Sequence, residues 1–169
     1  MCALNLLDLL PSELEALAER VGEPRYRGRQ LAAWIFKKGV LDLDAMTDLP
    51  KEFRQRLAEQ AFLGIPEIER VVRSEDRSQK FVLRLGDDRR VQSVLMPDNA
   101  RLTLCLSTQV GCGFACAFCF TGTMGLTRNL TVAEIVGQLA AVRATLPPSE
   151  RVTHLVFMGM GEPLANYAA

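Results

Sequence analysis

The 169-residue sequence lacks the features that direct a protein to a membrane or a secretory route. No hydrophobic run approaches the length of a transmembrane helix. The N-terminus has no basic segment, and its apolar run is interrupted by Asp8 and Pro11. Lys and Arg number 20 and balance 20 Asp and Glu, so net charge alone favours no membrane or nucleic-acid partner. We therefore expect a cytoplasmic protein with no membrane partner, long enough for one ordinary core and a small appendage.

Histidine is nearly absent, and this limits the metal sites that the chain can build. Three of the five cysteines lie in one short stretch as C-x3-C-x2-C: Cys112, Cys116 and Cys119. They are too close together for a secreted disulfide framework. A structural zinc site usually has four protein ligands, and no fourth Cys or His lies nearby. A [4Fe–4S] cluster held by three cysteines leaves one iron open for a cofactor, so the spacing favours iron–sulfur over zinc.

Residues 1–64 predict a small helical domain. Ser12–Glu15 has the form of a capping box at the start of a first helix. Further helical patterns cover residues 25–38 and begin again at Pro50. From Arg20 to Arg56, nine basic residues stand against five acidic ones. Two interpretations remain open: the solvated faces of an amphipathic bundle, or an accessory domain that contacts RNA.

After residue 64 the pattern changes to strands. Alternation over residues 80–85 and 90–96 predicts a β-hairpin, within a connector spanning residues 65–100. The following elements read as a βαβ unit over residues 101–169: a strand at 102–108, the cysteine loop, a helix opened by a capping box at Thr131, and a buried parallel strand at 153–158. Chemistry in such units lies at the carboxyl ends of the strands, where both the cysteine loop and Gly159–Pro163 fall.

These two motifs together resemble the radical S-adenosylmethionine (SAM) superfamily. The resemblance rests on the cysteine spacing, with an aromatic residue before the last cysteine, and on the run Gly159-Met160-Gly161-Glu162-Pro163. Three longer stretches resemble the RlmN family, which methylates C2 of adenosine in 23S rRNA and, in many members, tRNA: residues 104–112, 124–130 and 22–27. The implied fold is α/β, the start of a partial (βα)6 TIM-like barrel preceded by a small helical domain and a β-hairpin.

The resemblance also implies roles for individual residues. Cys112, Cys116 and Cys119 ligate the [4Fe–4S] cluster, Phe118 lies against the adenine of SAM, and Gly161 and Glu162 hold its methionine amino group. Cys105 matches the thiol that resolves a covalent protein–RNA intermediate. A reductant such as flavodoxin or ferredoxin is the implied electron donor. By itself Cys105 would read as a small buried hydrophobe.

The sequence departs from the family pattern at two points. Gln92 stands where the family usually has a glutamate proton acceptor, and an amide cannot serve as that base. No cysteine follows Cys119 in the chain, whereas the family carries its methyl group on a later one. We therefore expect an incomplete enzyme that does not methylate RNA alone and has an unpaired strand edge at residues 153–158. The alternatives are another radical SAM enzyme, such as a C8 adenosine methyltransferase, and a non-catalytic cluster- or RNA-binding module.

Overall fold

The computed structural model describes residues 3–167, so Cys2 lies outside the described residues. The chain divides into two compact units, Met1–Gly64 and Ile65–Ala169, which are described separately. Within the described part, no helix is long and apolar enough to cross a membrane.

The first unit is helical, as the sequence predicts. Its main helices are α1 (Pro11–Arg20), α2 (Arg25–Ala32) and α3 (Lys51–Ala58). The shorter elements are the 3-10 turns η1 (Leu6–Asp8) and η3 (Leu43–Ala45), the π-helical turn η2 (Ala33–Lys38), and the parallel pair β1 (Leu4–Asn5) and β2 (Ala61–Phe62). Helices α1 and α2 approach closely at Gly28, where an added Cβ would lie 2.4 Å from the Glu15 Cα.

The capping box expected at Ser12 is wrong. Helix α1 begins at Pro11, and Ser12 is already helical. The Glu13 carboxylate accepts a hydrogen bond from the Leu10 N–H at 2.7 Å. Proline at the first helical position fixes the start of the helix, because its φ is preset and its missing N–H needs no partner there.

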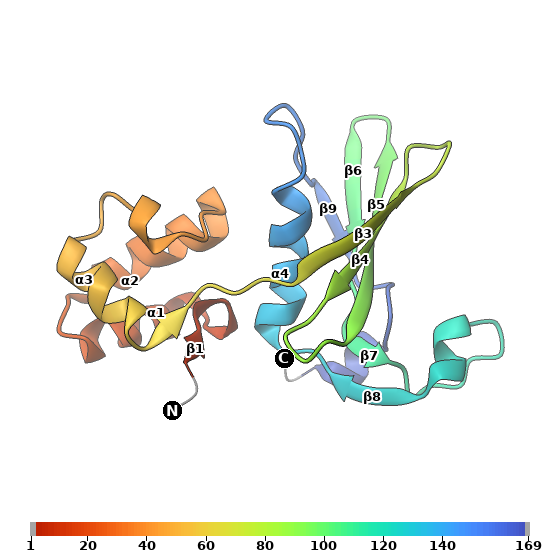
Figure 1. Cartoon of the computed structure of the whole chain (residues 1–169), viewed down its shortest axis with the longest axis horizontal. Helices are drawn as coiled ribbons and strands as arrows, with labels where there is room; N and C mark the ends of the chain where they lie inside the picture. The colour runs from red at the N-terminus through yellow and green to blue at the C-terminus, as the bar shows by residue number, and fades with distance from the viewer. Residues whose placement is uncertain (1–2, 168–169) are drawn as a thin grey trace. The chain divides into compact units, whose positions relative to one another are not determined.

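The second unit is built on a five-stranded sheet of order β3-β4-β5-β6-β9 (Figure 1). Its strands are β3 (Glu67–Arg73), β4 (Gln79–Arg84), β5 (Arg90–Asp98), β6 (Arg101–Cys105) and β9 (His154–Val156). Neighbours from β3 to β6 are antiparallel, and β6 pairs with β9 in parallel. The expected hairpin is β4–β5. Residues 65–100 do not form a separate connector, because β5 pairs directly with β6. The sequence pattern did not predict β3, because the side chains of this strand are mostly exposed.

One face of this sheet is covered by α4 (Val132–Arg143), whose capping box at Thr131 and Glu134 is confirmed. Alternate residues of the strands point to this face. The resulting core contains apolar side chains from the sheet and from α4, among them Phe81, Leu83, Val91, Leu95, Leu104 and Val142. The βαβ order of β6, α4 and β9 is therefore as the sequence predicts.

Strand β9 is shorter and less buried than expected. It spans three residues, and Phe157 and Met158 beyond it are 48% and 81% exposed. Among the described strands, β9 pairs only with β6, so it is the edge of the sheet. The apolar run thus has few neighbours to cover it, which agrees with the unpaired edge predicted from the sequence.

Candidate radical SAM site

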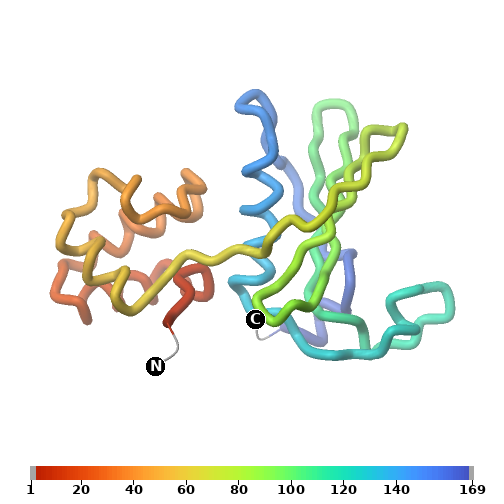
Figure 2. Tube along the Cα trace, viewed as in Figure 1, coloured from red at the N-terminus to blue at the C-terminus, as the bar shows by residue number. Residues whose placement is uncertain are grey.

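The cysteine loop is attached to the sheet by a second, smaller ladder. Strand β7 (Gln109–Gly111) pairs with β8 (Leu126–Asn129), and the loop extends between them through the 3-10 turn η4 (Phe120–Met124), as Figure 2 shows in blue-green. Gly111 has φ +77°, and a Cβ there would lie 1.9 Å from the Gly125 carbonyl oxygen. Only glycine allows this crossing, which returns the chain to the sheet after the loop.

The three loop cysteines have different environments. Cys112 is buried, Cys116 is exposed and Cys119 is half-buried. Among residues 3–167, no three Cys, His, Asp or Glu side chains lie close enough together to hold a metal ion. The convergence of three thiolates expected from the spacing is therefore not formed in this structure.

The chemistry of the donors nevertheless fits a thiolate-bound group. The Phe114 N–H donates to the Cys112 Sγ at 3.4 Å. A backbone hydrogen bond from Gly122 is the main cause that lowers the pKa of Cys119. Backbone N–H groups directed at sulfur stabilise thiolates and are a known influence on iron–sulfur clusters. The exposed position of Cys116 leaves it unconstrained by packing.

Aromatic side chains surround the cysteines without being packed. Phe118 is 93% exposed and Phe120 is 83% exposed. Phe118, expected to contact the SAM adenine, is thus accessible to a ligand. Large exposed apolar side chains gathered on one loop typically mark a surface that is covered in the functional state.

The Gly159–Pro163 turn is held at the same end of the sheet by hydrogen bonds. The Met160 carbonyl accepts from the N–H groups of Thr108 and Gln109 at 2.8 and 3.2 Å. The Met160 N–H donates to the Ser107 Oγ at 2.9 Å. Gly161 has φ +103°, and a Cβ there would lie 2.6 Å from the Gln109 Cβ. The turn is therefore fixed against the segment that joins β6 to β7, as the two motifs predict.

Glu162 has a structural role within this turn. Its carboxylate accepts from the Leu164 N–H at 3.0 Å, capping the 3-10 turn η5 (Pro163–Asn166). Its own N–H donates to the Gln109 Oε1 at 3.0 Å. These bonds fix the position of Glu162, and its contact with a SAM amino group stays a prediction.

Cys105 and Gln92 lie on one face of the sheet, opposite the α4 face. Cys105 pairs with Val94 of β5 and Val156 of β9. Gln92, two residues before Val94, shares its face by strand alternation. Cys105 is 7% exposed, and burial raises the pKa of its thiol, partly offset by a backbone hydrogen bond from Met158. Gln92 is exposed.

A buried polar network that was not anticipated from the sequence connects these elements. The Gln138 amide, on α4, accepts from the Ser93 Oγ and the Ser107 N–H, and donates to the Ser107 carbonyl. The Ser107 hydroxyl donates to the Gln92 carbonyl at 2.6 Å. The signal in the sequence was a glutamine on the apolar face of the helix, because a buried amide must find partners.

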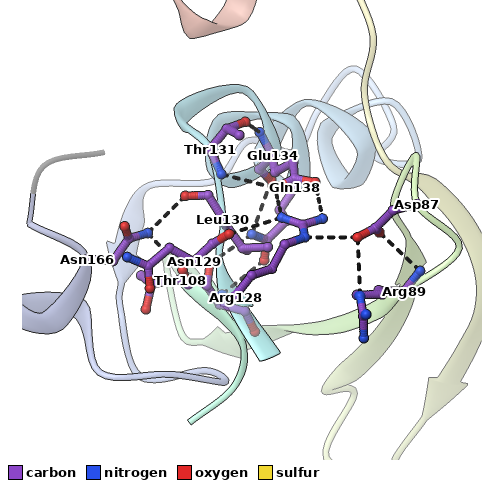
Figure 3. Close-up of polar contacts among 11 residues, drawn as sticks. Asp87, Arg89, Thr108, Arg128, Asn129, Leu130, Thr131, Glu134, Gln138 and Asn166 are labelled. Carbon is purple, nitrogen blue, oxygen red and sulfur yellow. Dashed lines mark hydrogen bonds and ion pairs between the residues drawn. The ribbon is translucent and has the colours of Figure 1, made fainter. Parts of the chain in front are cut away.

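A second group of polar contacts fixes β8 and η5 (Figure 3). Arg128 makes ion pairs with Asp87 at 2.9 Å and Glu134 at 2.7 Å. The Asn166 amide donates to the Thr108 and Leu130 carbonyls, both at 2.9 Å. Arg128 thus joins β8 to the β4–β5 turn and to α4.

In the first unit, many of the basic side chains are engaged internally. Arg25 and Arg29 both contact the Glu15 carboxylate. Arg56 pairs with Glu23, and the Lys38 ammonium lies 3.2 Å from the centroid of the Trp34 ring. Fewer positive charges are therefore free to contact a partner than the count of basic residues suggests.

Comparison with known proteins agrees with the resemblance seen in the sequence. Residues 4–63 match the ribosomal RNA large subunit methyltransferase N-terminal domain, the RlmN N-terminal family. The dual-specificity RNA methyltransferase RlmN of Halorhodospira halophila is 47% identical over 96% of this chain and 45% of its own length. The RlmN of Syntrophus aciditrophicus is 42% identical over 99% of the chain and 48% of its own length.

A solved structure agrees as well. The crystal structure of a radical SAM methyltransferase from Sphaerobacter thermophilus matches with a TM-score of 0.88 and 43% identity, over 98% of this chain and 49% of that one. The chain thus spans about half the length of the curated relatives it matches, and it is homologous to that half throughout.

Proposed function

From this homology with RlmN proteins, we propose that the chain supplies the SAM-cleaving part of a radical SAM methyltransferase acting on C2 of adenosine in 23S rRNA and also in tRNA. The observation that carries the proposal is the meeting of two motifs at one end of the sheet. The turn at Gly159–Pro163 is bonded to residues 107–109, and the cysteine loop follows directly from β7. We further propose that β6 and β9 are the first two parallel strands of a partial (βα)6 barrel.

In this proposal Cys112, Cys116 and Cys119 bind a [4Fe–4S] cluster. When bound, the cluster supplies the electron that cleaves SAM, delivered by a reductant such as flavodoxin or ferredoxin. The protein's own contribution is to direct the backbone N–H groups of Phe114 and Gly122 at the sulfurs of Cys112 and Cys119. Phe118 offers an exposed ring for the adenine, and Gly161 and Glu162 offer acceptors for the methionine ammonium.

Cys105 is the thiol proposed to resolve the protein–RNA intermediate. Because burial raises its pKa, the thiol is protonated at neutral pH and must lose its proton before it can act as a nucleophile. Gln92, on the same face, can donate or accept a hydrogen bond but cannot take that proton. We propose that Gln92 orients substrate, and that a different group acts as the base.

Residues 1–64 are proposed to be the RNA-contacting accessory domain, since residues 4–63 match a domain named for ribosomal RNA methyltransferases. Lys37 and Lys38 end the second helical segment, where cations are also favoured by the helix dipole. The competing interpretation, a bundle whose charges serve solubility, is supported by the internal pairing of Arg25, Arg29 and Arg56.

The test begins with anaerobic reconstitution of the chain with iron and sulfide. We expect brown protein with broad absorption in the blue, and loss of that absorption in Cys112→Ala, Cys116→Ala and Cys119→Ala. Cys2→Ala and Cys105→Ala are matched controls that should keep it, since neither belongs to the cluster motif. Colourless protein that retains zinc would contradict the proposal.

Cleavage and methylation are measured separately. Reduced, reconstituted chain should bind SAM and release 5′-deoxyadenosine, while labelled SAM should leave no label in the C2 position of RNA, because this chain has no cysteine after Cys119. Label at C2 would contradict the expectation that this chain cleaves SAM without methylating RNA. A cluster-containing chain that binds RNA but never cleaves SAM would instead favour the non-catalytic cluster- or RNA-binding module. The amide at Gln92, in place of a catalytic carboxylate, supports that alternative.

A further inference from the structure

A cavity of about 350 Å³ lies at the end of the sheet away from the cysteine loop. It is formed where three connections meet: the β3–β4 turn, the β5–β6 turn and the segment between α4 and β9, which lie together at the top of Figure 1. The proposed SAM site lies at the other end of β6, so this cavity belongs to a different surface of the second unit.

Three arginines from the three connections line this cavity: Arg77, Arg101 and Arg151. No ion pair or side-chain hydrogen bond found among residues 3–167 involves their guanidinium groups, whereas Arg84, Arg90 and Arg128 in the same unit are paired with carboxylates. Glu150 is the one acidic side chain among the lining residues. The cavity therefore has an excess of uncompensated positive charge.

Two carboxylates of the β3–β4 and β5–β6 turns, Asp76 and Asp98, bond to residues of their own turns. Asp76 accepts from the Ser78 N–H and hydroxyl, both at 3.0 Å. Asp98 accepts from the Asn99 amide at 3.0 Å. Neither lines the cavity, so neither neutralises it from within.

The backbone at two lining positions is unusual. Arg77 has φ +67° and Asn99 has φ +50°, in the left-handed region that favours glycine. Asparagine tolerates this region, but a long side chain such as arginine is uncommon there. An arginine in this conformation is less stable than a glycine would be. A role for the guanidinium itself would account for it.

From this arrangement we propose that the cavity lined by Arg77, Arg101 and Arg151 binds phosphodiester groups of the RNA substrate. Guanidinium groups offer paired donors that match phosphate oxygens, and the Asn99 amide and Ser149 hydroxyl add neutral donors. This inference rests on the proposed function only in naming RNA as the ligand.

The position of the cavity suits an RNA whose base reaches Cys105. Strand β6 runs from Arg101 to Cys105, about 13 Å at about 3.3 Å per residue. An RNA strand that places an adenosine at the carboxyl end of β6 would have the phosphates of nearby nucleotides close to the amino end of β6. The cavity would thus position the backbone and leave base recognition to the other end.

The experiment measures RNA binding by the full 169-residue chain without iron or SAM. A fluorescein-labelled RNA hairpin with an adenosine in its loop is titrated over a series of salt concentrations. Arg77→Gln, Arg101→Gln and Arg151→Gln should each weaken binding several-fold. The triple variant should reduce the slope of log K against log salt by about 2 to 3, the value for three lost phosphate contacts. Glu150→Gln should strengthen binding.

The matched control is Arg70→Gln on β3, an exposed arginine of the same unit that does not line the cavity. It should change binding little, and circular dichroism should show that all variants are folded. Unchanged binding by the triple variant, an equal loss in Arg70→Gln, or no RNA binding by the unmodified chain would each overturn the proposal. So would binding of inorganic phosphate that depends on the three arginines while RNA affinity does not.

Because no cluster is present in this assay, failure of cluster assembly leaves its result intact. Conversely, a chain that fails to bind RNA through the cavity can still assemble the cluster and cleave SAM. The two proposals can therefore fail independently.

Discussion

The cysteine loop and the Gly159–Pro163 turn serve one proposed site, yet they differ sharply in how the chain holds them. The turn is bonded to residues 107–109 and has no room for a side chain at Gly159 or Gly161. The loop is largely exposed, and its thiols do not converge. The turn is thus held by contacts within the fold, and in the proposed site it would offer its SAM acceptors in a fixed position, whereas the three cysteines would have to come together to bind a cluster.

The largest expected effect is a difference in thiol reactivity. Cys116 is exposed, whereas Cys105 is buried and its pKa is raised. At neutral pH a smaller fraction of Cys105 is therefore thiolate than of a thiol with an ordinary pKa. We expect iodoacetamide to modify Cys116 faster than Cys105 by on the order of a hundredfold or more, since Cys105 also needs local opening. Peptide mass spectrometry over time measures both rates. Similar rates would mean that the sheet around Cys105 is not closed.

The next effect concerns the crossing where the loop leaves and rejoins the small ladder. Gly111→Ala combines φ +77° with a Cβ 1.9 Å from the Gly125 oxygen, so it should lower the free energy of unfolding by about 3 kcal/mol. Gly125→Ala is the comparison: it has open space around the Cβ, but φ +68° with ψ 169° is a conformation almost restricted to glycine, so it should cost about 2 kcal/mol from backbone strain alone. Urea titration compares the two. Equal losses would show that backbone strain, and not the close crossing, requires glycine at position 111.

A smaller effect is expected from the network behind the turn. Gln138→Leu leaves the Ser107 N–H and carbonyl without their buried partner, which should cost about 2 kcal/mol of the free energy of unfolding. Gln55→Leu, at an exposed position of α3, should change it by less than about 0.5 kcal/mol. Urea titration again supplies the values. If Gln138→Leu also weakens SAM binding and Gln138→Glu restores part of it, the network positions the turn as well as stabilising the fold.

Much of the second unit could be predicted from local pattern. Alternation at residues 80–85 and 90–96 revealed β4 and β5, and the Thr131 capping box revealed α4, because both signals depend on neighbours in sequence. Strand β3 gave no such signal, since both of its faces are mostly exposed and its pairing is set by β4. The burial of residues 153–158 was overestimated because apolar composition does not say which neighbours exist.

The candidate site divides in the same way. The spacing of the cysteines and the Gly159–Pro163 run identified the two motifs, and the βαβ order predicted that they meet at one end of the sheet. The Gln138 network and the arginine-lined cavity could not be predicted, because their members come from segments that are far apart in the sequence. Which polar groups are buried together depends on how α4 packs on the sheet.

The sequence by itself determined the chemistry: three thiols, an adjoining glycine-rich turn and the helices and strands that carry them, since each of these follows from residue type and short-range spacing. Only the tertiary structure decided how they are held. It fixed the turn against residues 107–109, left the cysteines apart, buried Cys105 between β5 and β9, and gathered Arg77, Arg101 and Arg151 around one cavity. Contacts between distant segments require the whole second unit to fold, and no local pattern encodes them.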